Sequence, residues 1–310
     1  MLDESLLEEA ILRVLQKSAI EIPEDVKRAF ESCIQKEESE LAKLHLRKFL
    51  ESINFAAARK IPVCPDTGWP ILFVKLGSQV TIRGGYLVVE KAFREAVKKA
   101  TELGFLRVTM VDPISRKSSV NNVGNYIPYV EYKPFFADYI EVTAVTKGGG
   151  SELFILQPTR VVLLADGIIG IKKFIIDSAI SGLIDGKTCP PNVLGIGIGG
   201  TTDLCMRLAK QAAVLRPIGD RHPEPRIAGL EEDILNALNS LGIGPMGCGG
   251  KFAVFDVHIE YAYTHTAGTV IGVNMQCALC RRATVRIYDD GTIEDRKLPS
   301  WFESGRNERS

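Results

Sequence analysis

The stretch Thr188-Cys-Pro-Pro-Asn-Val-Leu-Gly-Ile-Gly-Ile-Gly-Gly-Thr201 carries two signals that predict different folds. Gly195, Gly197 and Gly200 have the G-x-G-x-x-G spacing of a dinucleotide-binding turn between a strand and a helix. Cys189 stands in front of two prolines, a context that suits a metal ligand held on a stiff loop. The first signal indicates a phosphate-binding turn, and the second indicates the wall of a metal site.

The surrounding sequence favours packing over nucleotide binding. A dinucleotide fold needs an acidic residue about 20 positions further on, at the end of a second strand. Asp220 has that offset, but the prolines between 216 and 225 predict a loop there. We therefore expect the glycines to let a helix capped by Thr201 or Thr202 lie close to the strand before it, with the N–H groups of its N-terminus facing an anion such as a carboxylate. A nucleotide-binding oxidoreductase is the alternative.

The composition predicts a globular protein without general affinity for nucleic acid or an anionic membrane. Lys+Arg and Asp+Glu both number 38, so the formal net charge is zero, and 45% of the residues are hydrophobic. No apolar run reaches about 18 residues, and the acidic start MLDESLLEEA lacks a signal-peptide core. We expect a cytoplasmic protein that associates with a partner, because chains near neutrality tend to associate.

Hydrophobic periodicity predicts a mixed α/β (α+β) fold. A helical lead-in, residues 1–60, should pack on a main domain at 61–300, in which helices flank a mixed sheet; residues 301–310 are predicted to form a polar tail. Helices are predicted at 6–15, from Pro23, and at 37–59, 92–104, 167–183, 201–215 and 231–241. Strands are predicted at 71–76, 139–145, 193–198 and 253–261, with a final hairpin turning at 289–291.

Seven cysteines in such a chain do not suggest a disulfide framework, which belongs to small secreted domains. Cys64, Cys189 and Cys277 stand beside turn residues or at a strand end, where a side chain can leave the core. Cys33 and Cys205 fall inside helix patterns and read as apolar filler. A structural zinc site in a non-catalytic subunit stays open, although no second C-x-x-C completes a pair with 277–280.

Five motifs occur in an order that resembles a known family. They are Val63-Cys-Pro-Asp-Thr-Gly68, Lys147-Gly-Gly-Gly-Ser151, Cys189-Pro-Pro191 leading into Gly195–Gly200, Leu241-Gly-Ile-Gly-Pro-Met-Gly247, and the segment around Cys277. From about Ile61 to Ile287 the chain resembles the α subunit, or N-terminal domain, of class I fumarases and L-tartrate dehydratases.

The resemblance implies an iron–sulfur hydro-lyase. Its members hold a 4Fe–4S cluster by three cysteines, which match Cys64, Cys189 and Cys277 of this sequence. Three thiolates on four irons leave one iron open to act as a Lewis acid on a 2-hydroxy dicarboxylate. The resemblance also implies that the cluster lies at one edge of the sheet, with the N-terminus of the helix after Thr201 pointing toward the cluster and the substrate.

Four further positions match residues of the family. Asp66 matches an acid/base aspartate, although an Asx-turn role would also explain it. Arg107 matches an arginine that binds a substrate carboxylate; otherwise it is a surface arginine on a strand. Gly150 matches a residue whose backbone N–H contacts substrate. His265 matches a histidine near the reacting carbons, although a lone histidine is more often structural.

The sequence also departs from the family pattern. Pro65 stands where the family usually has a glutamine that approaches substrate, and Cys248 and Cys280 match no ligand. The resemblance implies that a β subunit supplies the remaining active-site residues, in an α2β2 assembly, and that this chain alone is inactive. Fumarate hydration ((S)-malate to fumarate and water) is expected first, with L(+)-tartrate dehydration as the alternative.

Overall fold

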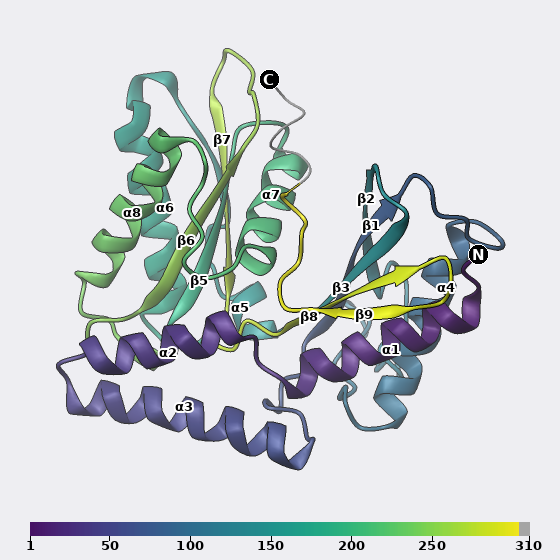
Figure 1. Ribbon diagram of the computed structural model, residues 1–310. Coiled ribbons are helices and arrows are strands. Elements are labelled where there is room, and N and C mark those ends of the chain that lie inside the picture. Colours follow the sequence, from purple (N-terminus) through teal and green to yellow (C-terminus); the bar gives the residue numbers. More distant parts are fainter. Residues whose placement is uncertain (304–310) are drawn as a thin grey trace. The chain divides into compact units, whose positions relative to one another are not determined.

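The computed structural model of the chain describes residues 1–303, so most of the predicted polar tail lies outside the described residues. The chain folds into two compact units (Figure 1). Unit 1 comprises Met1–Pro23, Ser52–Gly148 and the chain from Arg281 onward; unit 2 comprises Glu24–Glu51 and Gly149–Cys280. The predicted α/β class and helical N-terminal section are confirmed, but there are two mixed sheets, one in each unit, rather than a single sheet.

Unit 1 is built on a five-stranded sheet of order β2-β1-β3-β8-β9. Strand β1 is parallel to β2 and antiparallel to β3, and the remaining pairs are antiparallel. The elements are α1 (Glu4–Ile20), β1 (Trp69–Gly77), α4 (Leu87–Glu102), β2 (Tyr129–Phe135), β3 (Tyr139–Lys147), β8 (Arg282–Tyr288) and β9 (Ile293–Arg296).

Helices α1 and α4 cover one face of this sheet. The Asp3 side chain caps α1 by accepting a hydrogen bond from the Leu6 N–H (3.1 Å), which satisfies a donor that the helix leaves unpaired. The apolar stripe of α1 then packs with α4 against β1, β3 and β8. On the other face Phe73 meets Trp301 edge-on, with ring centroids 5.4 Å apart, and Lys75 donates to the Ser300 carbonyl oxygen (2.7 Å).

Unit 2 is built on a four-stranded sheet of order β4-β7-β5-β6, in which β5 is parallel to β6 and antiparallel to β7. Its elements are α2 (Glu24–Lys36), the part of α3 (Glu40–Arg59) up to Glu51, α5 (Gly149–Leu153), β4 (Thr159–Val162), the 3-10 turn η1 (Leu164–Asp166), α6 (Gly167–Leu183), β5 (Asn192–Ile198), α7 (Thr202–Leu215), α8 (Pro225–Asn239), the 3-10 turn η2 (Pro245–Gly247), β6 (Val254–Tyr261) and β7 (Thr269–Gln276).

The glycines of β5 set how closely the helices of unit 2 approach its sheet. Helix α7 packs on one face of the sheet, and α6 and α8 pack on the other (Figure 1). A Cβ placed on Gly195 would lie 2.0 Å from the Ala209 carbonyl oxygen of α7, and one on Gly197 would lie 2.0 Å from the Cys205 carbonyl oxygen. Only glycine permits this approach, so the predicted packing role is confirmed. Asp220 lies in the loop between α7 and α8, as expected.

Among residues 1–303, no helix is both long and apolar enough to cross a membrane.

Candidate functional site

In unit 1 the Cys64–Gly68 loop is bound to the segment that carries Arg107. The Arg107 backbone N–H donates to the Thr67 hydroxyl oxygen (2.9 Å), and its Nη1 donates to the Pro65 carbonyl oxygen (3.1 Å). Thr67 is buried, whereas the Arg107 side chain is exposed. Two predicted site residues, Asp66 and Arg107, are therefore carried by segments that hydrogen bond to one another. Arg107 lies in an irregular segment and not on a strand.

Asn122 holds the Arg107 segment in place, and the sequence analysis did not identify it. Its amide Nδ2 donates to the Arg107 carbonyl oxygen (2.9 Å), and its Oδ1 accepts from the backbone N–H groups of Thr109 and Met110 (2.9 and 3.2 Å). The residue is buried and has a positive φ of 63°, which asparagine tolerates better than most residues. The pair Asn121-Asn122 in a Ser-rich stretch is only a general turn signal, so the sequence does not reveal this role.

The Gly68 end of the Cys64–Gly68 loop packs directly on the C-terminal end of β3. Gly68 has φ +74°, and a Cβ there would lie 2.0 Å from the Lys147 carbonyl oxygen. A Cβ placed on Gly148 would lie 3.3 Å from the Asp66 carboxylate Oδ2 and 3.3 Å from Nη2 of Arg281. The Lys147-Gly148 motif is thus a close-packing element of unit 1, and it brings Asp66 near an arginine that the sequence analysis did not single out.

In unit 2, Asn192 ties the Cys189 loop to the residue before Cys277. Its Nδ2 donates to the carbonyl oxygens of Thr188 (2.8 Å) and Gln276 (3.0 Å), and its Oδ1 accepts from the Thr188 hydroxyl (2.7 Å). Asn192 and Thr188 are fully buried. Two side chains that the sequence analysis treated only as neighbours of the motif therefore position both cysteine segments.

A backbone hydrogen bond joins the two cysteine segments directly. The Ala278 N–H donates to the Cys189 carbonyl oxygen (3.0 Å). Cys189 itself has φ +56°, a region that side chains other than glycine rarely adopt and that costs on the order of 1–2 kcal/mol. Such strain persists where the surrounding contacts hold the residue in place, as Thr188 and Asn192 do here. Unit 2 therefore brings Cys189 and Cys277 to the same end of its sheet.

Gly150 lies beside the Cys189 loop. A Cβ placed on Gly150 would lie 2.3 Å from the Lys187 carbonyl oxygen. Helix α5, which carries Gly150, contacts β7, the strand that ends one residue before Cys277, and lies near the lower end of that strand in Figure 1. Three predicted site residues of unit 2 are thus gathered at one end of the sheet.

His265 lies at the opposite end of the same sheet. It sits in the loop between β6 and β7, where the Gly200 N–H donates to the Tyr263 carbonyl oxygen (3.2 Å). Strand β7 has eight residues, so its ends are roughly 25 Å apart at about 3.3 Å per residue. His265 is exposed, and its Nδ1 accepts from the Ala267 N–H (3.1 Å).

The same geometry corrects the expectation for helix α7. This helix begins after the end of β5, whereas Cys189 precedes the start of β5. Its N-terminus therefore faces the His265 end of unit 2 and does not point toward Cys189 and Cys277. Gly195 and Gly197 support packing along the strand, but they do not aim the helix at the cysteine pair.

The remaining cysteines lie outside these segments or support them. Cys33 and Cys205 are buried in α2 and α7, as predicted, and burial raises the pKa of each thiol to about 12. Cys248 is exposed. The buried Cys280 thiol donates to the Cys277 carbonyl oxygen (3.2 Å), so it supports the turn that follows the predicted ligand.

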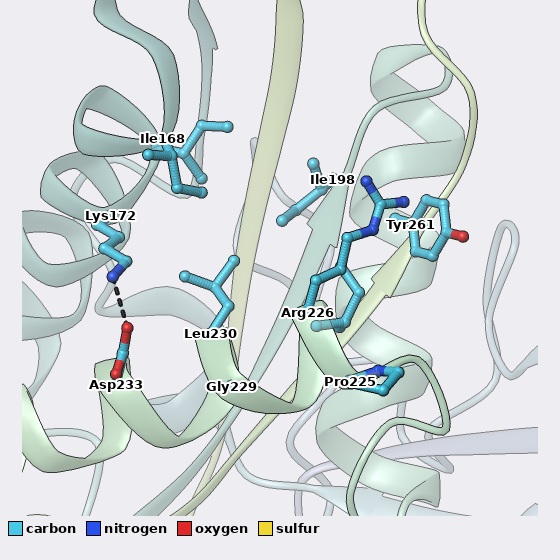
Figure 2. Close-up of a pocket in the computed structure, with 11 residues that line it drawn as sticks. Ile168, Lys172, Ile198, Pro225, Arg226, Gly229, Leu230, Asp233 and Tyr261 are labelled. Atoms are coloured by element: carbon cyan, nitrogen blue, oxygen red, sulfur yellow. Dashed lines mark hydrogen bonds and ion pairs between the residues drawn. The ribbon is translucent and has the colours of Figure 1, made fainter.

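Unit 2 has a large cavity of about 580 Å³ at the C-terminal ends of β5 and β6. No cysteine of the described residues lines it. Figure 2 shows apolar side chains from α6, α8 and the two strands around it. Its polar groups include Lys172, which is paired with Asp233 (2.6 Å), and Arg226, which is paired with Glu224. The cavity holds none of the predicted site residues.

The donor chemistry of the cysteine segments fits an iron–sulfur cluster in kind, because clusters take thiolate ligands. The segments that carry two of the three predicted ligands, Cys189 and Cys277, are joined in unit 2 by the Asn192 hydrogen bonds. The third, Cys64, belongs to unit 1 and is partly exposed. Within the described residues, no group of three or more histidine, cysteine or carboxylate side chains is already arranged around a metal position.

Comparison with known proteins gives a family and named relatives. A family model described as fumarate hydratase (Fumerase) matches residues 8–286. A Methanocaldococcus jannaschii protein, provisionally named L(+)-tartrate dehydratase subunit alpha, is 40% identical over 289 residues, which is 93% of this chain and 99% of that protein. The L(+)-tartrate dehydratase subunit alpha of Escherichia coli UTI89 is 31% identical over 275 residues, 88% of each chain. The chain therefore belongs to the fumarate hydratase (Fumerase) family and is a hydro-lyase.

Proposed function

We propose that this chain is the α subunit of a 4Fe–4S hydro-lyase that removes water from a 2-hydroxy dicarboxylate, with L(+)-tartrate as the first candidate substrate. The observation that carries the proposal is the buried Asn192, which binds the segments of Cys189 and Cys277 together. The sequence by itself favours fumarate hydration. The names of the similar proteins reverse that order, because each of the relatives described above is named as a tartrate dehydratase subunit.

In this proposal Cys64, Cys189 and Cys277 are the ligands of one cluster. When bound, a cluster held by three thiolates supplies an open iron that assists departure of the substrate hydroxyl group as a Lewis acid. Two backbone contacts hold the Cys189 loop in this proposal: the Cys189 N–H donates to the Gly186 carbonyl oxygen (2.9 Å), and the Cys189 carbonyl oxygen accepts from the Ala278 N–H (3.0 Å).

Asp66 and Arg107 act on the substrate in this proposal. The Asp66 carboxylate is the base that takes the proton from the carbon next to a substrate carboxylate. Arg107 is exposed and hydrogen bonds to the Cys64–Gly68 loop through the Pro65 carbonyl oxygen, and its planar guanidinium binds a substrate carboxylate. The Gly150 N–H is proposed as a further substrate contact, since α5 lies beside the Cys189 loop.

His265 lies in a loop at the far end of β7 from Cys277, and a catalytic role there is a separate part of the proposal. The substitution His265→Gln tests it by itself. A fall in kcat with unchanged iron content would support the role, and unchanged kinetics would remove His265 from the site.

A β subunit completes the enzyme in this proposal, as the word "subunit" in the relatives' names suggests. The assembly is proposed to be α2β2 and cytoplasmic, where thiol ligands stay reduced. Co-expression with a β-type partner, followed by light scattering of the purified complex, tests the association and its stoichiometry.

The cluster is tested by counting iron and sulfide in protein purified without oxygen. The proposal predicts about four iron per chain, lost in Cys64→Ser, Cys189→Ser and Cys277→Ser. The matched controls are Cys248→Ser and Cys280→Ser, which should keep the iron. Zinc in place of iron, or iron that survives all three ligand substitutions, would contradict the proposal.

The substrate is tested by assaying the complex with L(+)-tartrate, (S)-malate and fumarate. Oxaloacetate formed from L(+)-tartrate, with a higher kcat/KM than for malate, supports the first assignment. The second candidate, fumarate hydration, is favoured by the description of the matching family. It would replace the first if malate and fumarate interconvert and tartrate is not consumed.

A further inference from the structure

Arg281 is a buried cation whose guanidinium is left largely unpaired by residues 1–303. The residue is 1% exposed, and its Nε and Nη1 atoms form no hydrogen bond with any described residue. An arginine cannot lose its proton to relieve this situation, because the guanidinium stays charged in proteins. These two donor atoms therefore require an acceptor that residues 1–303 do not provide.

Two other arginines with little exposure show how this fold normally compensates such a charge. Arg216, also 1% exposed, donates to Glu231 (2.6 Å) and to Asp220 (2.9 Å). Arg286, on the strand that follows Arg281, donates to the buried Glu141 (3.0 Å). Burying a charge without a full set of partners is unfavourable, and Nε and Nη1 of Arg281 lack the acceptors that Arg216 and Arg286 have among the described residues.

Arg281 and Asp66 both lie beside Gly148. Nη2 of Arg281 and Oδ2 of Asp66 both lie 3.3 Å from the position that a Cβ of Gly148 would take. A Cβ at position 148 would be in tight contact with both the guanidinium and the carboxylate, so glycine lets these two groups lie close to the same backbone position. A small molecule that placed a carboxylate on Arg281 would therefore bring its neighbouring carbon close to Asp66.

We propose that Arg281 binds one carboxylate group of the dicarboxylate substrate and so orients the neighbouring carbon toward Asp66. This inference rests on the proposed function, and it adds a second guanidinium to Arg107. The rigid fork of N–H donors suits a planar carboxylate, and the burial of Arg281 excludes the water that would weaken the interaction. Asp66 remains the group that moves the proton, and Arg281 is a binding residue.

The test is the binding of succinate, a dicarboxylate without a hydroxyl group to lose, to the complex purified without oxygen. Calorimetry on the wild type, Arg281→Gln and Arg281→Lys should show that the dissociation constant rises about 10- to 100-fold in both variants, since a hydrogen-bonded charge pair is lost or loses its fork geometry. Iron content should stay unchanged. The KM for the reacting substrate should rise by a similar factor.

Arg286→Gln is the matched control, because it removes an arginine of the following strand whose partner is internal. It should lower the thermal stability and leave the succinate affinity unchanged. Arg281→Gln should behave in the opposite way: without succinate it should melt no lower than the wild type, and succinate should stabilise the wild type but not the variant. This contrast separates ligand binding from a structural role.

The outcomes distinguish this inference from the proposed function. If the wild type holds iron and turns over substrate, but Arg281→Gln binds succinate as tightly as the wild type does, the role of Arg281 is refuted and the hydro-lyase proposal stands. If Arg281→Gln unfolds without ligand while Arg281→Lys binds succinate normally, Arg281 is structural and the inference fails. If the wild type binds neither iron nor succinate, both proposals fail.

Discussion

The contact between α7 and β5 predicts that one methyl group on Gly195 will destabilise unit 2. The new Cβ of Gly195→Ala would lie 2.0 Å from the Ala209 carbonyl oxygen and 2.3 Å from the Ala213 backbone nitrogen. Ordinary contact distances are more than about 1 Å longer, so α7 must move away from the sheet. Both obstacles are backbone atoms, and a rotamer change cannot relieve the clash.

The size of the effect follows from the burial of this interface. Ala209 and Ala212 of α7 are fully buried, and a helix that shifts loses contact along its whole inner face. Overpacking of a tight core costs about 1–3 kcal/mol, and a backbone clash places Gly195→Ala at about 3 kcal/mol or more. With a urea m-value of about 3 kcal/mol/M for a chain of this size, the unfolding midpoint should fall by about 1 M.

Gly229→Ala is the matched control. Gly229 lies in α8 and is exposed, and a Cβ there would meet no heavy atom within 4 Å. The same substitution should therefore stabilise the protein by about 0.5–1 kcal/mol, because alanine favours the helix.

Urea unfolding followed by circular dichroism measures both variants, and hydrogen exchange of the α7 peptides reports whether that helix is loosened. A Gly195→Ala protein with the wild-type midpoint and unchanged α7 exchange would refute the packing argument. Loss of NAD binding with unchanged stability would instead favour a nucleotide-binding turn.

Three further outcomes are expected. Iodoacetamide at pH 8 should modify the exposed Cys248 of the native protein but not Cys33 or Cys205, because burial raises the pKa of each of these two thiols to about 12. Mass spectrometry of the digested protein measures this, and faster modification of the buried thiols would contradict it. Burial by itself raises the pKa of Asp256, but its histidine, backbone and arginine partners hold that pKa below the ordinary 3.8. The ionised Asp256 carboxylate therefore stabilises the fold at neutral pH, and this contribution is lost as the pH falls below 3.8. The stability gap between wild type and Asp256→Asn should accordingly shrink between pH 7 and pH 3, and a gap constant with pH in urea titrations would be inconsistent with it. Gly150→Ala, whose Cβ would meet a carbonyl oxygen at 2.3 Å, should displace the adjacent cysteine loop and lower the iron content, whereas full iron loading would count against that contact.

Local patterns predicted most of the individual elements. The apolar run 167–183 is α6 with the predicted limits, and the predicted helix after Thr201 is α7. The prediction for 253–261 had one apolar and one polar face, and the strand does form there. Its polar residues Asp256 and His258 are buried, however, because the Arg216–Pro225 loop supplies partners such as Arg221 (2.6 Å from Asp256). Burial of a polar face by a distant loop leaves no periodic signal.

Strands β2, β4 and β7 were not among the predicted strands. Strand β7 reads Thr269-Val-Ile-Gly-Val-Asn-Met-Gln276, a run without clear alternation, since seven of its eight positions are buried on one face or the other. A strand covered by α7 on one side and by α6 on the other is apolar throughout, and such a run does not distinguish strand from helix. Its place in the sheet is set by pairing with β5, which is a tertiary interaction.

The sequence by itself determined the family, the class of reaction, the helices and several strands, and the packing role of Gly195 and Gly197. These depend on residues close together in the chain or on motifs in a fixed order. Only the tertiary structure decided which residues far apart in the sequence lie in contact. Asn192 and Gln276 are 84 positions apart, yet the β5–β7 register makes them hydrogen-bond partners and brings Cys277 to the Cys189 loop. The unpaired donors of Arg281 are likewise visible only when every neighbour is known, because burial and pairing are properties of the folded chain.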